Sequence, residues 1–327
     1  MAQESTSKLR WGILATGAIA RAFAEGVKHS KLGVLQAVGS RSQSSADAFA
    51  DEFEIPNRHA RYEGLLEDPE VDAIYIATPH PLHKEWATKT AAAGKHVLCE
   101  KPIGLNASEA EAIIEAARQN DVFLMEAFMY RCSAQTAKII ELIADGAVGK
   151  VKTIEASFAF AIPGADPRGR HLNKELGGGG ILDVGGYPMS MARLVAGVAN
   201  GQAFAEPIEI KAVGHIGATG VDEYTSAVAS FPGGIVARLS CGVALDEPIA
   251  VSIAGDHGRL YVPLPWKPSP KGGRTELHLF RVGENRPQVI EVTTDEYLYG
   301  AEADTVARHI DERQAPSPAM SWDDTLG

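Results

Sequence analysis

Apolar and polar positions follow two different patterns along this chain, and the change comes near residue 130. Up to about residue 126, short apolar runs alternate with amphipathic segments of helical periodicity. The expected strands cover residues 9–14, 34–39, 73–77, 96–99 and 122–125, and the expected helices cover residues 18–27, 44–52, 83–93 and 107–118. Strands separated by helices form βαβ units, so this part is predicted to be a doubly wound parallel sheet of the Rossmann type with right-handed crossovers.

After residue 130, apolar and polar residues alternate over consecutive segments that are joined by short connections. The expected strands cover residues 151–160, 208–215, 225–231, 235–241, 249–254, 276–282 and 289–292, and helices are expected over residues 134–145 and from the glycine block at 177–180 through residue 196. A hairpin turn is expected at residues 231–235, an exposed proline-rich loop at 263–270, and a final amphipathic helix from Asp323, whose extent beyond Gly327 is left open. Strands in this order predict a mostly antiparallel sheet.

The two patterns predict an α/β protein with two domains, residues 1–128 and residues 129–327. The length of 327 residues agrees with two domains, and the 45% hydrophobic and 22% charged residues are ordinary for a soluble protein with a large core. The net charge of 31 − 42 = −11 disfavours a nucleic acid or an anionic membrane as a partner. Three widely spaced cysteines, no signal peptide and no long apolar run predict a cytoplasmic protein.

A lysine follows one of the expected parallel strands directly. Residues 96–99 form an apolar run, and Glu100-Lys101-Pro102 comes next. The carboxyl edge of a doubly wound sheet is where such folds bind ligands, and the proline biases the lysine toward an extended conformation. Lys101 is therefore a candidate for polarising a carbonyl or assisting proton removal from an alcohol, although most lysines lie on solvated surface.

The first strand is followed by a degenerate dinucleotide fingerprint, in which alanines replace the first and last glycines. Gly17 would allow the backbone to approach a pyrophosphate, and the helix N-terminus would bind its charge. We expect the replacement of the first glycine by Ala15 to be tolerated if this turn keeps φ negative. The predicted cofactor-binding residues of this turn are Ala15, Thr16, Gly17, Ala18 and Ile19. A glycine-containing turn without a ligand is the alternative.

The second strand ends in Ser40-Arg41 rather than in an acidic residue. An acidic residue at this place holds the ribose 2′-hydroxyl of NAD, whereas an arginine suits the 2′-phosphate of NADP. Ser40 and Arg41 therefore favour NADP as the cofactor, with NAD as the alternative; an arginine on the solvated surface would also explain the pattern.

Asp183 and Tyr187 lie after the glycine block and share one face of a predicted helix. A tyrosine near a lysine ammonium is a plausible proton donor or acceptor, because the positive charge lowers its pKa. A helix cap at Asp183 and core packing of Tyr187 are the simpler alternative. His80 and His83 have no further ligands at suitable spacing, so no metal site is predicted.

These motifs, in this order, resemble the Gfo/Idh/MocA oxidoreductase family over essentially the whole chain. The matching segments are residues 11–20, 77–79, 100–102, 126–131 and 178–187. The resemblance implies a Rossmann domain followed by an α/β domain whose open sheet forms a homodimer or a dimer of dimers. It also implies that Lys101 is catalytic, that Pro102 is often cis, and that Glu100 lies near the nicotinamide ribose.

The resemblance further implies that Thr78, Pro79 and His83 contact the cofactor and that Asp183 and Tyr187 belong to the substrate site. Tyrosine at position 187, rather than histidine, resembles the branch of dimeric dihydrodiol dehydrogenase, xylose dehydrogenases and glucose–fructose oxidoreductase, which largely prefers NADP. Two features depart from that branch: Ser133-Ala134 replaces a common His-Pro, and no twin-arginine export signal is present.

The resulting hypothesis is an NADP-dependent oxidoreductase acting on a sugar, a sugar derivative or a cyclic vicinal diol. Hydride would pass between the carbinol carbon and the nicotinamide while Tyr187 and Lys101 handle the proton, and Asp183 would bind a substrate hydroxyl. Arg170 and Asn173 are further candidates for substrate contact. The alternative is a non-catalytic dinucleotide-binding regulator of the same fold. The substrate and the direction of the reaction stay open.

Overall fold

The computed structural model describes residues 8–162, 164 and 166–327. It divides the chain into two compact units, one formed by the chain up to Met129 together with Asp295–Leu326, the other by Tyr130–Thr294 with Gly327. The predicted division instead assigned everything after residue 128 to the second domain. The difference arises because the C-terminal segment packs on the first unit, as described below.

The first unit contains a six-stranded parallel sheet of strand order β3-β2-β1-β4-β5-β6. Its strands are β1 (Leu9–Leu14), β2 (Gly33–Gly39), β3 (Asn57–His59), β4 (Ala73–Ile76), β5 (His96–Glu100) and β6 (Leu124–Ala127). The helices are α1 (Ala18–Lys28), α2 (Gln43–Phe53), α3 (Tyr62–Leu66), α4 (His83–Ala92) and α5 (Ala107–Gln119). The predicted Rossmann sheet is confirmed; the short elements β3 and α3 were not predicted, and β6 begins two residues later than expected.

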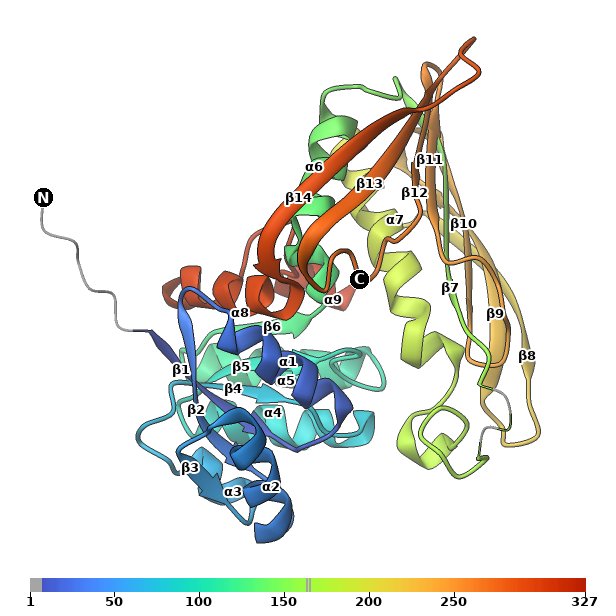
Figure 1. Cartoon of the computed structure of the whole chain (residues 1–327). Coiled ribbons are helices and arrows are strands. Elements are labelled where there is room, and N and C mark those ends of the chain that lie inside the picture. Colours follow the sequence, from blue (N-terminus) through green and yellow to red (C-terminus); the bar gives the residue numbers. More distant parts are fainter. Residues whose placement is uncertain (1–7, 163, 165) are drawn as a thin grey trace, which may run out of the picture. The chain divides into compact units, whose positions relative to one another are not determined.

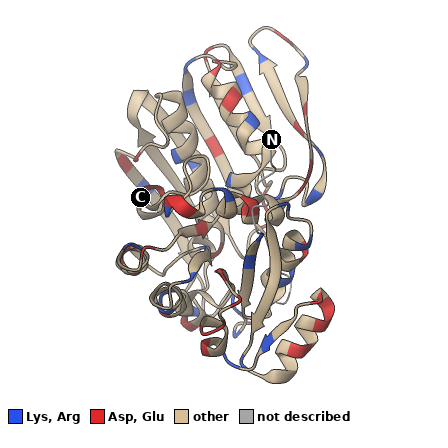
Figure 2. Ribbon diagram, turned by 90° about the vertical axis from the view of Figure 1, so that its left-hand side faces the viewer, with Lys and Arg blue, Asp and Glu red and all other residues tan. Residues whose placement is uncertain are grey.

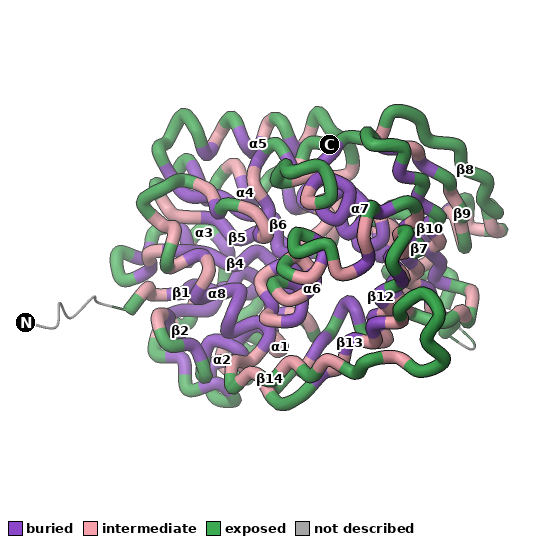
Figure 3. Tube along the Cα trace, turned by 90° about the horizontal axis from the view of Figure 1, so that it is seen from above, coloured by how far each residue is buried: buried purple, intermediate pink, exposed green. Residues whose placement is uncertain are grey.

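The central strands of this sheet are covered on both faces, which explains why they appear as continuous apolar runs. All four residues of β4 are buried, and so are four of the five residues of β5. Figure 3 shows the buried trace concentrated in these strands and on the inner sides of the helices. Side-chain caps start two of the helices: Ser42 accepts a hydrogen bond from the Ser45 amide, and Asn106 accepts one from the Glu109 amide.

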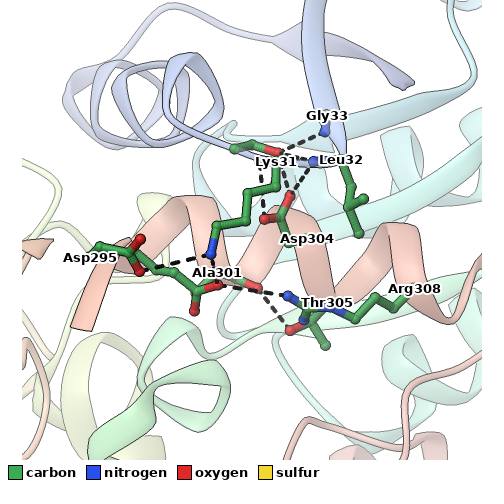
Figure 4. Close-up of polar contacts among 10 residues, drawn as sticks. Lys31, Leu32, Gly33, Asp295, Ala301, Asp304, Thr305 and Arg308 are labelled. Carbon is green, nitrogen blue, oxygen red and sulfur yellow. Dashed lines mark hydrogen bonds and ion pairs between the residues drawn. The ribbon is translucent and has the colours of Figure 1, made fainter. Parts of the chain in front are cut away.

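Helix α8 (Leu298–Arg308) returns the chain to the first unit and lies beside α1 (Figure 1). The two backbones approach so closely at Gly26 that an added Cβ would lie 2.7 Å from the amide nitrogen of Gly300. The buried Asp304 carboxylate accepts hydrogen bonds from the Ser30 hydroxyl and from the amides of Lys31 (3.1 Å) and Leu32 (2.9 Å), as Figure 4 shows. These contacts explain why residues 295–326 belong with the first unit.

The second unit contains an eight-stranded sheet of order β14-β13-β12-β11-β7-β10-β9-β8. Strands β7 and β10 pair in parallel, whereas β8–β9, β9–β10, β7–β11, β11–β12 and β12–β13 pair antiparallel. The strands are β7 (Val151–Ala159), β8 (Glu209–Ile216), β9 (Asp222–Phe231), β10 (Ile235–Gly242), β11 (Val251–Gly255), β12 (Gly258–Val262), β13 (Lys271–Arg281) and β14 (Gln288–Tyr297). The predicted mostly antiparallel sheet is confirmed, and β12 is an addition.

One face of this sheet is covered and the other is open. Helix α7 (Gly186–Ala199) packs on β7 and β10, and α6 (Ala134–Ala144) packs on α7. Along β10, residues Ile235, Ala237 and Leu239 are buried, while Val236 and Arg238 between them are exposed. Basic and acidic residues are interspersed with uncharged ones along the strands (Figure 2). The alternation is that of a sheet with one face packed against helices.

Two local predictions for the second unit differ from the structure. The helix after the glycine block begins as a π-helical turn, Ile181–Gly185, before α7 starts. The proline-rich stretch is irregular as expected, but it is not an exposed loop throughout, because Trp266 within it is only 2% exposed. The hairpin turn at residues 231–235 joins β9 to β10 as predicted.

In the part of the chain that the structure describes, every helix is too short or too polar to cross a membrane.

Candidate active site

The turn between β1 and α1 is shaped to receive an anion. Gly17 is the N-cap of α1; no side chain caps this helix and no acidic residue lies in its first turn, which includes Ala18 and Ile19. A Cβ placed on Gly17 would meet nothing within 4 Å. Open space before an uncapped helix N-terminus suits a pyrophosphate, so this turn fits a dinucleotide.

Ala15 lies in this turn with a φ of +82°. The condition under which alanine was expected to be tolerated, a negative φ, is therefore not met: the turn keeps the left-handed conformation that glycine adopts in the fingerprint, although the residue is alanine. Its amide donates a hydrogen bond to Gly39 O (3.0 Å), which holds this geometry against β2. A left-handed alanine costs about 1–2 kcal/mol.

Replacing Ala15 with glycine is expected to stabilise the protein by about 1 kcal/mol, because relief of the left-handed strain outweighs the added flexibility of the unfolded chain. Urea unfolding of Ala15→Gly measures the change. Gly94→Ala, which puts alanine at a φ of +73° with nothing within 4 Å of the new Cβ, provides the reverse comparison and should destabilise. Equal stability of Ala15→Gly and the wild type would contradict the assignment of strain.

The end of β2 combines a buried Ser40 with an exposed Arg41. No carboxylate lies within ion-pair distance of Arg41 among the described residues. Burial raises the pKa of Tyr62, and the nearby Arg41 guanidinium partly offsets this shift. Arg41 is thus an available cation at the strand end where a Rossmann fold binds the adenosine ribose.

His83 lies in the core rather than on a ligand-facing surface. It is fully buried, with Nε2 2.9 Å from Thr78 O and Nδ1 2.8 Å from Pro102 O. Both ring nitrogens lie within hydrogen-bond distance of backbone oxygens, and a neutral ring donates to one of the two, so the structure gives His83 a different environment from the predicted contact with the cofactor. Burial lowers its pKa. Among the described residues, no group of three or more His, Cys, Asp or Glu side chains is arranged to hold a metal ion.

Thr78 and Pro79 follow β4 after one intervening residue, at the carboxyl edge of the sheet. The Thr78 hydroxyl is buried and has no hydrogen-bond partner among the described residues. Buried hydroxyls normally have a partner, so this group is consistent with a ligand that approaches the strand end.

Glu100 is the last residue of β5, Lys101 and Pro102 follow it, and the Lys101–Pro102 peptide bond is cis, as the resemblance implied. The buried Glu100 carboxylate accepts hydrogen bonds from the Tyr75 hydroxyl and from the Lys101 amide (3.2 Å). Lys101 itself is partly exposed. The first unit thus presents an ammonium at the same sheet edge as the β1–α1 turn.

In the second unit, Asp183 is the centre of a small polar group. Its side chain is 4% exposed; Oδ1 accepts a hydrogen bond from Arg170 Nη1 at 2.8 Å, and Oδ2 lies 3.8 Å from His171 Nε2. Asn173 is occupied differently, because its Oδ1 caps the short helix Lys174–Leu176 through the Glu175 amide (3.0 Å). The structure therefore brings Arg170 to Asp183, but not Asn173.

Tyr187 is 3% exposed and is surrounded by aromatic rings. Its ring centroid lies 5.1 Å from that of Phe158, 5.6 Å from that of Trp266 and 5.7 Å from that of Tyr130. Trp266 is held in turn by a hydrogen bond from Nε1 to Ser157 O (2.9 Å). These three rings fix the orientation of the tyrosine within its unit.

Sequence reasoning missed His171 and the rings around Tyr187. The sequence could have suggested two of these residues, because His171 directly follows the candidate Arg170 and Phe158 lies in a predicted strand. It gave no indication for Trp266, which lies in the proline-rich stretch that was expected to be exposed. Ser133-Ala134 stands where related sequences commonly have His-Pro. The Ser133 hydroxyl donates a hydrogen bond to Tyr130 O (2.7 Å) and caps α6. Lys101 belongs to the first unit and Tyr187 to the second.

A parallel sheet in the Rossmann order, an open helix N-terminus after its first strand and a lysine at the sheet edge are typical of dinucleotide-dependent oxidoreductases. Residues 9–128 match the family described as "Oxidoreductase family, NAD-binding Rossmann fold", and residues 136–261 match the "GFO/IDH/MocA C-terminal domain". The chain belongs to the Gfo/Idh/MocA oxidoreductase family, as its motifs predicted.

Several curated relatives bear the name trans-1,2-dihydrobenzene-1,2-diol dehydrogenase. The mouse protein is 35% identical over 263 residues (80% of this chain, 76% of the relative), and the Danio rerio protein is 38% identical over 257 residues (78% and 74%). Among solved structures, aldose–aldose oxidoreductase from Caulobacter crescentus has a TM-score of 0.85 at 25% identity, covering 98% of this chain and 93% of that chain.

KijD10, a 3-ketoreductase from Actinomadura kijaniata solved with TDP-benzene and NADP, has a TM-score of 0.81 at 26% identity, covering 98% of this chain and 94% of that chain. The predicted enzyme class is confirmed: the chain is an NAD(P)-dependent dehydrogenase or reductase acting on CH–OH groups. These relatives do not favour the alternative of a non-catalytic regulator.

Proposed function

We propose that this protein is an NADP-dependent oxidoreductase that transfers hydride between the nicotinamide and the carbinol or carbonyl carbon of a sugar, a sugar derivative or a cyclic vicinal diol. The observation that carries the proposal is the position of Lys101, at the carboxyl end of β5 and on the same sheet edge as the dinucleotide turn. The names of the curated relatives and of the structural neighbours support this substrate class.

The β1–α1 turn (residues 15–19) would hold the pyrophosphate, and Thr78, Pro79 and Glu100 would lie toward the nicotinamide half. When bound, NADP supplies the hydride acceptor. In the oxidising direction, the substrate hydroxyl gives its proton to Tyr187 as its carbon loses hydride, and Lys101 favours the tyrosinate and stabilises the developing alkoxide. Asp183, held by Arg170, would accept a hydrogen bond from a second hydroxyl, and the rings around Tyr187 suit the carbon face of a cyclic substrate.

A screen of aldoses, keto-sugars, anhydrosugars and trans-1,2-dihydrobenzene-1,2-diol, with NADP and NAD side by side, tests this function. The expected result is a change in absorbance at 340 nm with at least one cyclic polyol or its ketone. This change should be faster with NADP than with NAD. Tight cofactor binding without turnover across the whole panel would contradict it.

The preference for NADP rests on Arg41, whose guanidinium would pair with the 2′-phosphate. Arg41→Ala is expected to weaken NADPH binding by about 10- to 100-fold, because a charge-assisted hydrogen bond to phosphate is lost, and to leave NADH binding within about two-fold. Quenching of protein fluorescence measures both affinities. Arg61→Ala, a nearby exposed arginine that pairs with Glu67, is the matched control. Equal losses for both cofactors would argue against a role for Arg41 at the 2′ position.

We further propose that two copies of the chain associate through the open face of the eight-stranded sheet. Val213 is 82% exposed, Val228 is 50% exposed and Val236 is 40% exposed, and all three lie on this face by register. The adjacent Arg238 and Glu155 form an ion pair there. Apolar residues ringed by charge are typical of protein interfaces. Sedimentation equilibrium of the full chain measures the mass that decides this.

A further inference from the structure

Three consecutive backbone groups around Lys101 are held by three buried ionisable side chains. The Lys101 amide donates to Glu100 Oε2 (3.2 Å), Pro102 O lies 2.8 Å from His83 Nδ1, and the Ile103 amide donates to Glu126 Oε1 (3.0 Å). Glu100 is 7% exposed, His83 is fully buried and Glu126 is 6% exposed. The three side chains come from β5, α4 and β6, so three separate elements converge on one short segment.

Glu126 is the one of the three for which the sequence analysis assigned no role. Buried glutamates are uncommon because a carboxylate loses hydration in the core, and they are retained where a specific partner needs them. Here the partner is the Ile103 amide, in a segment where backbone pairing between strands has ended. Removing Glu126 would leave that buried donor without an acceptor.

The surroundings of Glu126 come from three elements. The hydroxyl of Thr325 and the carboxylate of Asp324 face it from α9 (Trp322–Leu326), Glu100 and Cys99 face it from β5, and the Ile103 amide faces it from the segment after the lysine. Burial raises the pKa of Glu126 to about 7, and the neighbouring carboxylates of Asp324 and Glu100 act in the same direction.

We propose that Glu126 is a positioning residue for Lys101: it fixes the backbone two residues beyond the lysine and thereby sets where the ammonium lies. This inference rests on the proposed function, in which Lys101 handles the proton. The carboxylate acts through the Ile103 amide and touches neither substrate nor cofactor. Misplacing a catalytic group by 1 Å can cost about 100-fold in rate.

The test compares full-length wild type with Glu126→Leu, which lacks an acceptor, and Glu126→Gln, which keeps an acceptor oxygen but cannot ionise. Lysines are methylated reductively with ¹³C-formaldehyde, and the Lys101 resonance is assigned by its absence in Lys101→Met. Glu126→Leu is expected to change the chemical shift of that resonance. Glu126→Gln is expected to keep the wild-type chemical shift near pH 6, where the wild-type carboxyl is protonated.

Ionisation of Glu126 strengthens its hydrogen bond to the Ile103 amide, so the wild-type Lys101 resonance should show a second inflection near pH 7 that Glu126→Gln lacks. The folded-state pKa lies above the ordinary 4.5, so the wild type should also lose stability, relative to Glu126→Gln, as the pH rises from 4.5 to about 7. An unchanged Lys101 resonance in Glu126→Leu, or an inflection near pH 7 that persists in Glu126→Gln, would overturn the proposal.

Turnover separates this inference from the proposed function. With the best substrate of the panel, Glu126→Leu should lower kcat by about 10- to 100-fold while NADPH binding stays within about two-fold, and Glu126→Gln should restore most of the rate. The control is Asp304→Asn, which weakens another buried carboxylate–backbone contact of the same unit (Figure 4) and should lower Tm without changing kcat. If the wild type turns over no substrate, the proposed function fails, and the Lys101 resonance alone decides the role of Glu126.

Discussion

Replacing Lys101 with methionine is expected to lower kcat by about 10²- to 10⁴-fold while NADPH affinity stays within about two-fold. Methionine keeps the length and the apolar stem of lysine but has no charge. Without the ammonium, the alkoxide would form without a cation to stabilise its charge. The effect should fall on kcat because this interaction strengthens only as charge develops in the transition state.

Steady-state kinetics with the best substrate of the panel measures the change, and fluorescence titration measures the cofactor affinity. Lys89→Met is the matched control, because Lys89 is an exposed lysine of α4 that pairs with Glu85, and its kcat should match the wild type. Near-wild-type turnover of Lys101→Met would remove the lysine from the chemistry. A large loss of NADPH affinity at unchanged kcat would make it a cofactor contact instead.

Replacing Trp266 with alanine is expected to lower the unfolding free energy of the second unit by about 3–5 kcal/mol. The side chain is 2% exposed, and its ring stacks on that of Phe158 with the two ring centroids 5.9 Å apart. Its removal therefore leaves a large cavity among aromatic rings. It also leaves Ser157 O without the indole N–H that binds it. Because Tyr187 packs on the same ring, kcat should fall as well.

Urea unfolding, followed by circular dichroism, measures this loss, because the remaining tryptophans (Trp11, Trp86 and Trp322) all lie in the first unit. Trp266→Phe keeps most of the ring packing and loses only the indole donor, so it should cost about 1–3 kcal/mol. Lys267→Ala, at the exposed neighbouring position, should stay within about 0.5 kcal/mol of the wild type. Equal stability of Trp266→Ala and Lys267→Ala would show that the tryptophan is not part of the core.

The Rossmann half could be predicted well because most of its strands are continuous apolar runs separated by periodic helices. Residues 18–27 and 83–93 were expected as helices, and the structure has Ala18–Lys28 and His83–Ala92. The strand β3 has only three residues, too few to show an alternation of apolar and polar positions, and it is ordered by pairing with β2. Helix α8 was missed, and its membership in the first unit depends on a close approach between Gly26 and Gly300 that sequence spacing does not reveal.

The candidate site was predictable where motifs follow strand ends, as for Gly17, Arg41 and Lys101. It was not predictable where the partners are distant in sequence. Glu126 reaches the Ile103 amide across 23 positions, and Trp266 reaches Ser157 O across 109. The positive φ of Ala15 could not be predicted for another reason: alanine prefers negative φ, whereas here the backbone is left-handed and hydrogen-bonded to Gly39.

The return of α8 to the first unit has a consequence for biosynthesis. The Asp304 carboxylate that pairs with the Lys31 and Leu32 amides leaves the ribosome more than 270 residues after its partners. The segment Tyr130–Thr294, which is contiguous, is synthesised in full before that carboxylate appears. The unit that begins the chain is therefore the last to be completed, and until then its helix α1 exposes the surface around Gly26 that α8 will cover.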